Sequence, residues 1–198
     1  MRVTVRPGFL ALLCAGAYFG SVQLLLMFLA VAAAHEAGHL LAARLMGRRV
    51  TGLTLSALGA ELRLSGVTAF WQDALLALSG PAVNLALAAL CAARGIAPVF
   101  IGANLLLGAF NLLPIRPLDG GCAVYALLSL TVSQRWAERL TTMLSGACAL
   151  SVALVGAWLL IRDVSNPWLL CMGVWLAWGV FFPSFASGAC NSLPFHIK

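Results

Sequence analysis

The feature that most restricts the fold is a long apolar run near the start of the chain. Residues 7–43 contain no Lys, Arg or Asp, and their only Glu is Glu36. A membrane-spanning helix needs about 20 mostly apolar residues, so this run is too long for one span and barely long enough for two. Its length predicts one helix near residues 4–19 and a second near residues 22–43.

Composition extends this prediction to the whole chain. Of the 198 residues, 62% are hydrophobic and 9% are charged, whereas a soluble domain carries about 25% charged residues. Further uncharged runs cover 74–93, 95–115, 140–161 and the residues from 164 onward. We therefore expect an all-α polytopic membrane protein with about six transmembrane helices, forming one domain over 1–198. The six cysteines show no CxxC pair, and we interpret them as small apolar side chains rather than as a disulfide framework.

The distribution of basic residues predicts the orientation of these helices. With both termini inside, ten basic residues lie on the cytoplasmic side and only Arg94 and Arg162 lie outside. Positive charge marks the cytoplasmic loops of membrane proteins. The formal net charge of +6 is explained in the same way, so we expect no nucleic-acid partner.

Residues 51–65 differ from the apolar runs. TGLTLS and AELRLS alternate polar with apolar residues, which is typical of half-buried strands. The pattern predicts a small membrane-associated β-hairpin after the second helix, with its turn at residues 57–59. Its leucines are expected to face the membrane or the spans, so that the opposite face and a free edge stay open for substrate. An amphipathic loop with no binding role is the alternative.

The second predicted helix contains the stretch AHEAGH, residues 34–39. Residues four apart on an α-helix point the same way, so His35 and His39 can present two imidazoles to one metal, with Glu36 beside a bound water as general base. Ionisable groups inside a span are costly and therefore mark functional sites. Zn²⁺ offsets that cost because it binds neutral imidazoles and lowers the pKa of bound water to about 7. A chance HExxH is the alternative.

A catalytic zinc needs a third protein ligand and an open position. The remaining histidine, His196, lies two residues from the end of the sequence and is poorly placed. Four carboxylates are assigned to the hairpin, to a helix start, to a polar loop and to the outer side: Glu61, Asp73, Glu138 and Asp163. That leaves Asp119, in the stretch NLLPIRPLDGG, whose prolines and glycines break the fourth span near its cytoplasmic end. Asp119 as the N-cap of the next helix is the alternative, and the two roles are compatible.

The two stretches together resemble the site-2 protease family of intramembrane zinc metalloproteases. That family carries HExxH on one span and an N-x-x-P-x-x-x-x-D-G motif on a later span, and the resemblance covers roughly residues 22–128. It implies that His35, His39 and Asp119 are zinc ligands and that Glu36 is the base. The six-span plan, the early HExGH and the hairpin most resemble the branch of the stage IV sporulation protein FB, which processes a membrane-associated pro-sigma factor.

The same resemblance assigns residues around the site. Asn111 and Pro114 match the motif that shapes the site and its substrate contacts. Asn84, in the stretch SGPAVN, matches the family's G-P-x-x-N and is expected near the site as a substrate-binding residue; hydrogen bonding between helices is the alternative. Arg116 departs from the pattern by adding a cation near Asp119. It either snorkels as a positive-inside residue or holds a substrate carbonyl or carboxylate.

The resemblance implies hydrolysis of a peptide bond in or next to a substrate's membrane segment. The resemblance implies a multi-pass protein of a bacterial cell membrane, with its active site near the cytoplasmic side. It also implies a membrane-associated protein substrate and an inhibitory or activating membrane partner. We expect no PDZ or CBS domain. The alternative function is a membrane metal-binding or metal-transport protein that uses the same three ligands; a general base beside the metal has no clear purpose there, and no internal repeat is visible.

Overall fold

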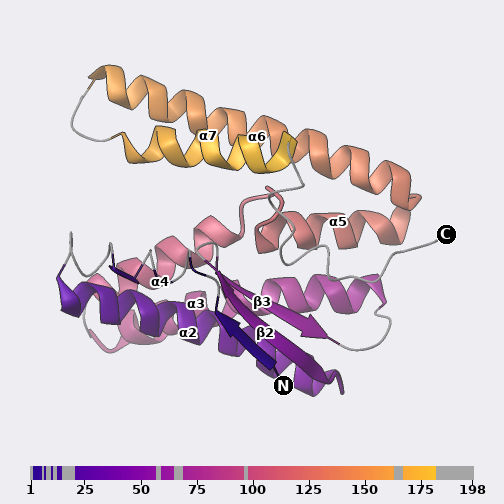
Figure 1. Cartoon of the computed structure of the whole chain (residues 1–198), viewed down its shortest axis with the longest axis horizontal. Coiled ribbons are helices and arrows are strands. Elements are labelled where there is room, and N and C mark those ends of the chain that lie inside the picture. Colours follow the sequence, from indigo (N-terminus) through magenta and orange to yellow (C-terminus); the bar gives the residue numbers. More distant parts are fainter. Residues whose placement is uncertain are drawn as a thin grey trace.

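The computed structural model describes residues 2–5, 7, 10, 13–14, 21–56, 59–64, 69–95, 98–162 and 167–181. Most of this part of the chain is helical (Figure 1). The helices are α2 (Val22–Leu45), α3 (Phe70–Ala93), α4 (Pro98–Asn111), α5 (Asp119–Thr131), α6 (Gln134–Arg162) and α7 (Trp168–Phe181). The mostly helical architecture predicted from the sequence is therefore confirmed.

The number of membrane spans is not confirmed as six. Among the described residues, α2, α3 and α6 are long and apolar enough to cross a membrane. The helices α4, α5 and α7 have 14, 13 and 14 residues. At 1.5 Å per residue each reaches about 20 Å, which is shorter than the hydrocarbon layer of about 30 Å. Most of the predicted helix near 4–19 lies outside the described residues, and its first positions, Thr4 and Val5, belong to a strand.

Two predicted boundaries also differ from the structure. The fourth apolar run, 95–115, ends its helix at Asn111, because the proline-containing segment 112–118 cannot continue it. The fifth run, 140–161, begins its helix earlier, at Gln134. Glu138 was expected on a polar loop and instead lies in α6, since the helix continues past the apolar run into polar sequence. The second helix matches its prediction more closely: it starts at Val22, and the Ser21 Oγ accepts a hydrogen bond from the Leu24 amide.

The predicted hairpin is present and is part of a larger sheet. Strands β2 (Val50–Ser56) and β3 (Gly59–Leu64) pair antiparallel, and β1 (Arg2–Val5) pairs parallel with β2. The strand order is β1-β2-β3, so β2 is central and β3 ends the sheet on one side (Figure 1). The third strand was not foreseen, because β1 and β2 are joined by the whole of α2 rather than by a turn.

The orientation of β2 differs from the expectation. Gly52 and Thr54, on the polar face of the strand, are buried, with Thr54 only 6% exposed. Successive side chains of a strand point to opposite faces, so the rest of the protein covers the face that was expected to stay open. The side chains of the four leucines expected to face the spans lie outside the described part.

Helix α3 is the centre of the helical packing, since it contacts α2, α4 and α5. Small residues allow the closest approach: an added Cβ on Gly38 of α2 would lie 2.7 Å from the Ser79 carbonyl oxygen of α3. A second unit is formed by α6 and α7, which lie side by side in Figure 1. There an added Cβ on Gly156 would lie 2.5 Å from the Leu170 amide nitrogen. Small residues at such contacts are typical of helix packing in membranes.

The outer surface of the helices is apolar. Leu106 on α4, Ile161 on α6 and Trp168 on α7 are 67%, 82% and 78% exposed. Water would not tolerate such a continuous apolar surface, whereas lipid tails do. The long apolar helices and this surface identify an integral membrane protein.

The cysteines do not all match their interpretation. Cys14, Cys91, Cys148 and Cys171 are free, as expected. Cys122, at the start of α5, is disulfide-bonded. The absence of a CxxC spacing excludes only a local bridge, because cysteines distant in sequence can meet in the fold.

We predict that Gly38→Ala lowers the free energy of unfolding by about 1–3 kcal/mol, as overpacked side chains do. The new methyl group would meet a backbone oxygen that cannot move aside without shifting α3. Thermal unfolding of the purified protein in detergent measures this. Gly102→Ala in α4 is the control, because nothing lies within 4 Å of its added Cβ. Equal unfolding temperatures for the two variants would contradict the close α2–α3 approach.

Candidate metal centre

Helix α2 places both histidines of the HExxH stretch on its buried face. His35 and His39 are 6% and 9% exposed, and they lie one helical turn apart, as four-residue spacing requires. Glu36 follows His35 on the same helix and is half-buried. The helix can bring these side chains to the interior because Gly38 lies against α3.

Asp119 reaches the same place from a segment far away in the sequence. It is the first residue of α5, after the irregular segment 112–118. The Ser145 hydroxyl of α6 anchors that segment: it accepts a hydrogen bond from the Arg116 amide and donates one to the Pro114 carbonyl, both at 3.1 Å. Gly120 lies against the Leu112 backbone, which any larger residue would displace. These contacts direct the first turn of α5 toward α2.

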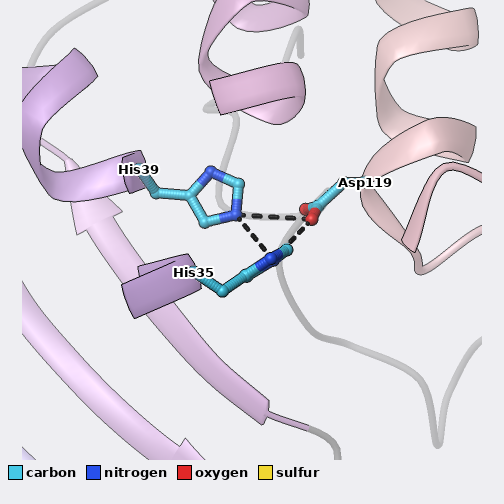
Figure 2. A group of neighbouring side chains, drawn as sticks. All are labelled: His35, His39 and Asp119. Carbon is cyan, nitrogen blue, oxygen red and sulfur yellow. Dashed lines mark hydrogen bonds and ion pairs between the residues drawn. The ribbon is translucent and has the colours of Figure 1, made fainter. Parts of the chain in front are cut away.

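The three side chains point at one another, as Figure 2 shows. The Asp119 Oδ2 lies 2.9 Å from the His35 Nε2 and 3.3 Å from the His39 Nε2. The two Nε2 atoms are 3.2 Å apart. Within the described part of the chain, these three residues form a group whose ligand atoms all lie within 4.8 Å of one another.

The hydrogen-bond partners of the two Nδ1 atoms determine which nitrogen of each imidazole ring carries the proton. The His35 Nδ1 lies 2.9 Å from the Asn84 Oδ1, and the His39 Nδ1 lies 2.8 Å from the Leu76 carbonyl oxygen. Both oxygens only accept hydrogen bonds, so each Nδ1 carries the proton and donates it. In the neutral rings each Nε2 then carries a lone pair. Outer-shell hydrogen bonds of this kind orient metal-binding histidines.

This arrangement fits a zinc ion. Zinc–nitrogen distances of about 2.0–2.1 Å in a tetrahedral site separate the ligand atoms by roughly 3.3 Å. The three separations here are 2.9, 3.2 and 3.3 Å. Two imidazole lone pairs and a carboxylate facing one another at this distance repel, and a bound cation removes that repulsion. Two histidines and one carboxylate also leave a fourth position open, as in catalytic zinc sites.

The residues predicted around the ligands lie as follows. Asn84 contacts the site directly through His35, and it also bonds to the neighbouring helix through Asn104. Asn111 donates to the Leu107 carbonyl of its own helix, and the Pro114 carbonyl accepts from Ser145. The roles of Asn111 and Pro114 in substrate binding stay predictions. His196 lies outside the described residues.

Arg116 lies against an aromatic ring. Its guanidinium is 4.9 Å from the centre of the Tyr125 ring on α5, and Tyr125 contacts Phe70 of α3 edge to face. This cation–π contact holds the Arg116 side chain against α5. Whether it also meets a substrate stays a prediction.

Sequence reasoning missed three residues that support the ligands. Ser79 lies 3.2 Å from the His39 Nδ1 and donates to the Leu76 carbonyl at 2.6 Å. Gly80 lies directly under both imidazoles, where a Cβ would overlap the His39 ring. Asn104 is fully buried beside Asn84. A polar residue inside an apolar helix was the available signal for Asn104.

Comparison with known proteins finds relatives that are named as zinc metalloproteases. No protein-family model matches the chain. It is 35% identical over 176 residues to Rip3, a candidate zinc metalloprotease of Mycobacterium tuberculosis, covering 78% of this chain and 43% of the relative. It is 39% identical over 115 residues to sll0528, a candidate zinc metalloprotease of Synechocystis, covering 52% of this chain and 30% of the relative. The chain thus spans less than half the length of these curated relatives.

A solved structure decides the fold. The site-2 protease from Methanocaldococcus jannaschii superimposes with a TM-score of 0.65, covering 90% of this chain and 88% of that one at 20% sequence identity. The fold is that of a site-2 protease. The relatives' names and the His–His–Asp group together support Zn²⁺ as the metal. These similarities show a shared fold and zinc-metalloprotease relatives; the protease activity and the sporulation branch belong to the proposed function.

We predict that Asp119→Ala weakens zinc binding by more than roughly 100-fold, because losing a ligand should exceed the 10–100-fold loss seen for outer-shell partners. Zinc content after dialysis against a competing chelator measures this. Removal of residues 195–198, which include His196, is the control and should leave zinc content unchanged. Loss of zinc on that deletion, with zinc retained in Asp119→Ala, would mean that the ligand set is wrong.

Proposed function

We propose that this chain is an intramembrane zinc metalloprotease of the site-2 type, which hydrolyses a peptide bond in or next to the membrane segment of a membrane-associated protein. The observation that carries the proposal is the convergence of His35, His39 and Asp119 at ligand separations, with Glu36 beside them on a helix long enough to span the membrane. The fold shared with a site-2 protease supports it.

Each of these residues has a defined part in such a reaction. His35, His39 and Asp119 would hold the zinc, which when bound supplies Lewis-acid polarisation of the scissile carbonyl and an acidic water. Glu36 would take a proton from the attacking water as the water oxygen bonds to the carbonyl carbon. The same carboxyl group then delivers the proton to the leaving amide nitrogen as the carbon–nitrogen bond breaks.

A second part of the proposal concerns how the substrate is held. A helical substrate keeps its carbonyl groups in hydrogen bonds, so it must become extended before hydrolysis. The sheet offers a place for an extended segment, because within the described residues β3 pairs on one side only, with β2. An unpaired strand edge presents backbone donors and acceptors to which a peptide can add as a further strand.

The substrate class and cellular setting extend the proposal. A membrane-associated pro-sigma factor is the proposed substrate, on the residue resemblance to the sporulation branch. The proposed location is a bacterial cell membrane, with the site near the cytoplasmic side and an inhibitory or activating membrane partner. The basic cluster at the end of α2 supports this side: Arg44, Arg48 and Arg49 begin five residues after His39. Arg48 also donates to Gln72 at the start of α3, at 2.8 Å.

We predict that Glu36→Gln lowers cleavage of a single-span substrate by at least about 10²-fold, since general-base catalysis contributes roughly 10²–10⁴-fold, while zinc stays bound. Cleavage by the purified protein in detergent, with and without a chelator, and zinc content of the same samples measure this. A fully active variant, or one that has lost its zinc, would mean that the role of Glu36 is misassigned. Chelator-resistant cleavage by the parent protein would contradict the metalloprotease proposal itself.

The strand-edge proposal is tested by proline, which lacks the N–H needed for strand addition. Adjacent residues of a strand direct their N–H groups to opposite sides of the strand. Leu62→Pro and Arg63→Pro in β3 are therefore made as two separate variants. One of the two should reduce cleavage about tenfold or more while zinc stays bound. The control is Thr54→Ser, which leaves every backbone donor in place. Parent-level cleavage by both proline variants would show that this edge does not hold the substrate, and the sheet would then have no role in substrate binding. Thr54→Pro is expected to disrupt the sheet itself, because β2 is central.

A further inference from the structure

Two buried amides lie behind the zinc ligand His35, and only Asn84 contacts its ring directly. Asn84 on α3 and Asn104 on α4 are both 0% exposed. Burying an amide in an apolar helix bundle is costly unless its groups are hydrogen-bonded. Both side chains are bonded here, and their bonds connect three helices in series.

The series has a fixed direction. The Asn104 Nδ2 donates to the Phe100 carbonyl at 2.9 Å, and the Asn84 Nδ2 donates to the Asn104 Oδ1 at 3.2 Å. The Asn84 Oδ1 then faces the His35 Nδ1 at 2.9 Å. A backbone carbonyl can only accept, so Asn104 must turn its NH₂ group toward Phe100 and its oxygen toward Asn84. Asn84 must in turn present its own oxygen to His35. Reversing either amide would place two acceptors or two donors face to face.

We propose that Asn104 is a positioning residue for the zinc ligand His35. Through Asn84, it keeps the proton on the His35 Nδ1 and so keeps the lone pair of Nε2 directed at the metal. A carbonyl group of the α4 backbone thereby determines the tautomer of a ligand on α2. The inference rests on the ligand role of His35 in the proposed function, and it does not depend on which substrate is cleaved.

The two histidines differ in this respect, which gives an internal control. His39 donates directly to the Leu76 carbonyl of α3, with Ser79 beside it. No amide stands between that ring and the backbone acceptor. A change at Asn104 should therefore alter the tautomer of His35 and leave that of His39 unchanged.

The experiment compares three variants of the full chain in detergent. Asn104→Leu removes both hydrogen-bonding groups at similar volume. Asn104→Asp keeps them, because a buried, protonated carboxyl group donates one O–H and presents one carbonyl oxygen. Thr141→Val is the matched control: Thr141 is also 0% exposed and donates to a backbone carbonyl four residues earlier, on α6. If leucine prevents folding, Asn104→Ala removes the same groups with a smaller side chain.

Two readouts are used, zinc affinity by chelator competition and the ¹⁵N NMR shifts of the imidazole rings in metal-free protein at alkaline pH. We expect Asn104→Leu to weaken zinc binding about 10–100-fold, as loss of outer-shell partners does, and to give His35 mixed tautomers. Asn104→Asp and Thr141→Val should stay within a few-fold of the parent. A purely structural role predicts the reverse order for the Asn104 variants, because leucine suits an apolar interior better than a carboxyl group does.

Parent-like zinc affinity and an unchanged His35 tautomer in Asn104→Leu would overturn the inference. So would equal losses in Asn104→Leu and Thr141→Val. These outcomes are distinct from failure of the proposed function, in which the parent protein binds zinc and shows the His35 tautomer described here but cleaves no membrane substrate.

Discussion

The convergence of two imidazoles and a carboxylate in an apolar helical protein is the constraint on which the rest of the structure depends. Three electron-rich atoms within 3.3 Å of one another repel in a poorly solvated interior, and a cation bound among them removes that repulsion. The group is assembled from two segments separated by more than 80 residues, α2 and the first turn of α5. The packing around it holds both segments in place.

Most of that support comes from one face of α3. Leu76, Ser79, Gly80 and Asn84 are spaced three, one and four residues apart, so they lie on one side of the helix. Gly80 gives the imidazoles room, and the other three fix the orientation of the rings through their Nδ1 atoms. The SGPAVN stretch therefore contacts His35 and His39, and Asn84 also hydrogen-bonds to α4 through Asn104. Substrate contact by Asn84 stays a prediction.

The position of the third ligand, Asp119, depends on an irregular segment of the chain. Asp119 can reach α2 because α4 stops at Asn111 and the segment 112–118 is anchored to α6 through Ser145. Ile115 in that segment is fully buried in a cluster with Ala149 and Leu176. The α6–α7 pair, which lies apart from α2 in Figure 1, thus contributes to the metal centre by holding the segment that leads to Asp119.

Local sequence patterns predicted most of the helices and the hairpin, and elimination among the carboxylates added Asp119 to the two histidines with which it converges. Helical spacing alone places His35 above His39, and two-residue alternation alone marks β2 and β3, because both depend on neighbours a few positions away. Tertiary structure decided the features that depend on distant partners. These are the pairing of β1 with β2, the burial of Thr54, the disulfide bond of Cys122 and the lengths of α4 and α7. It also decided the path from Phe100 through Asn104 and Asn84 to His35. A buried amide can be recognised as unusual in a sequence, but the direction of its hydrogen bonds depends on which helices pack against it.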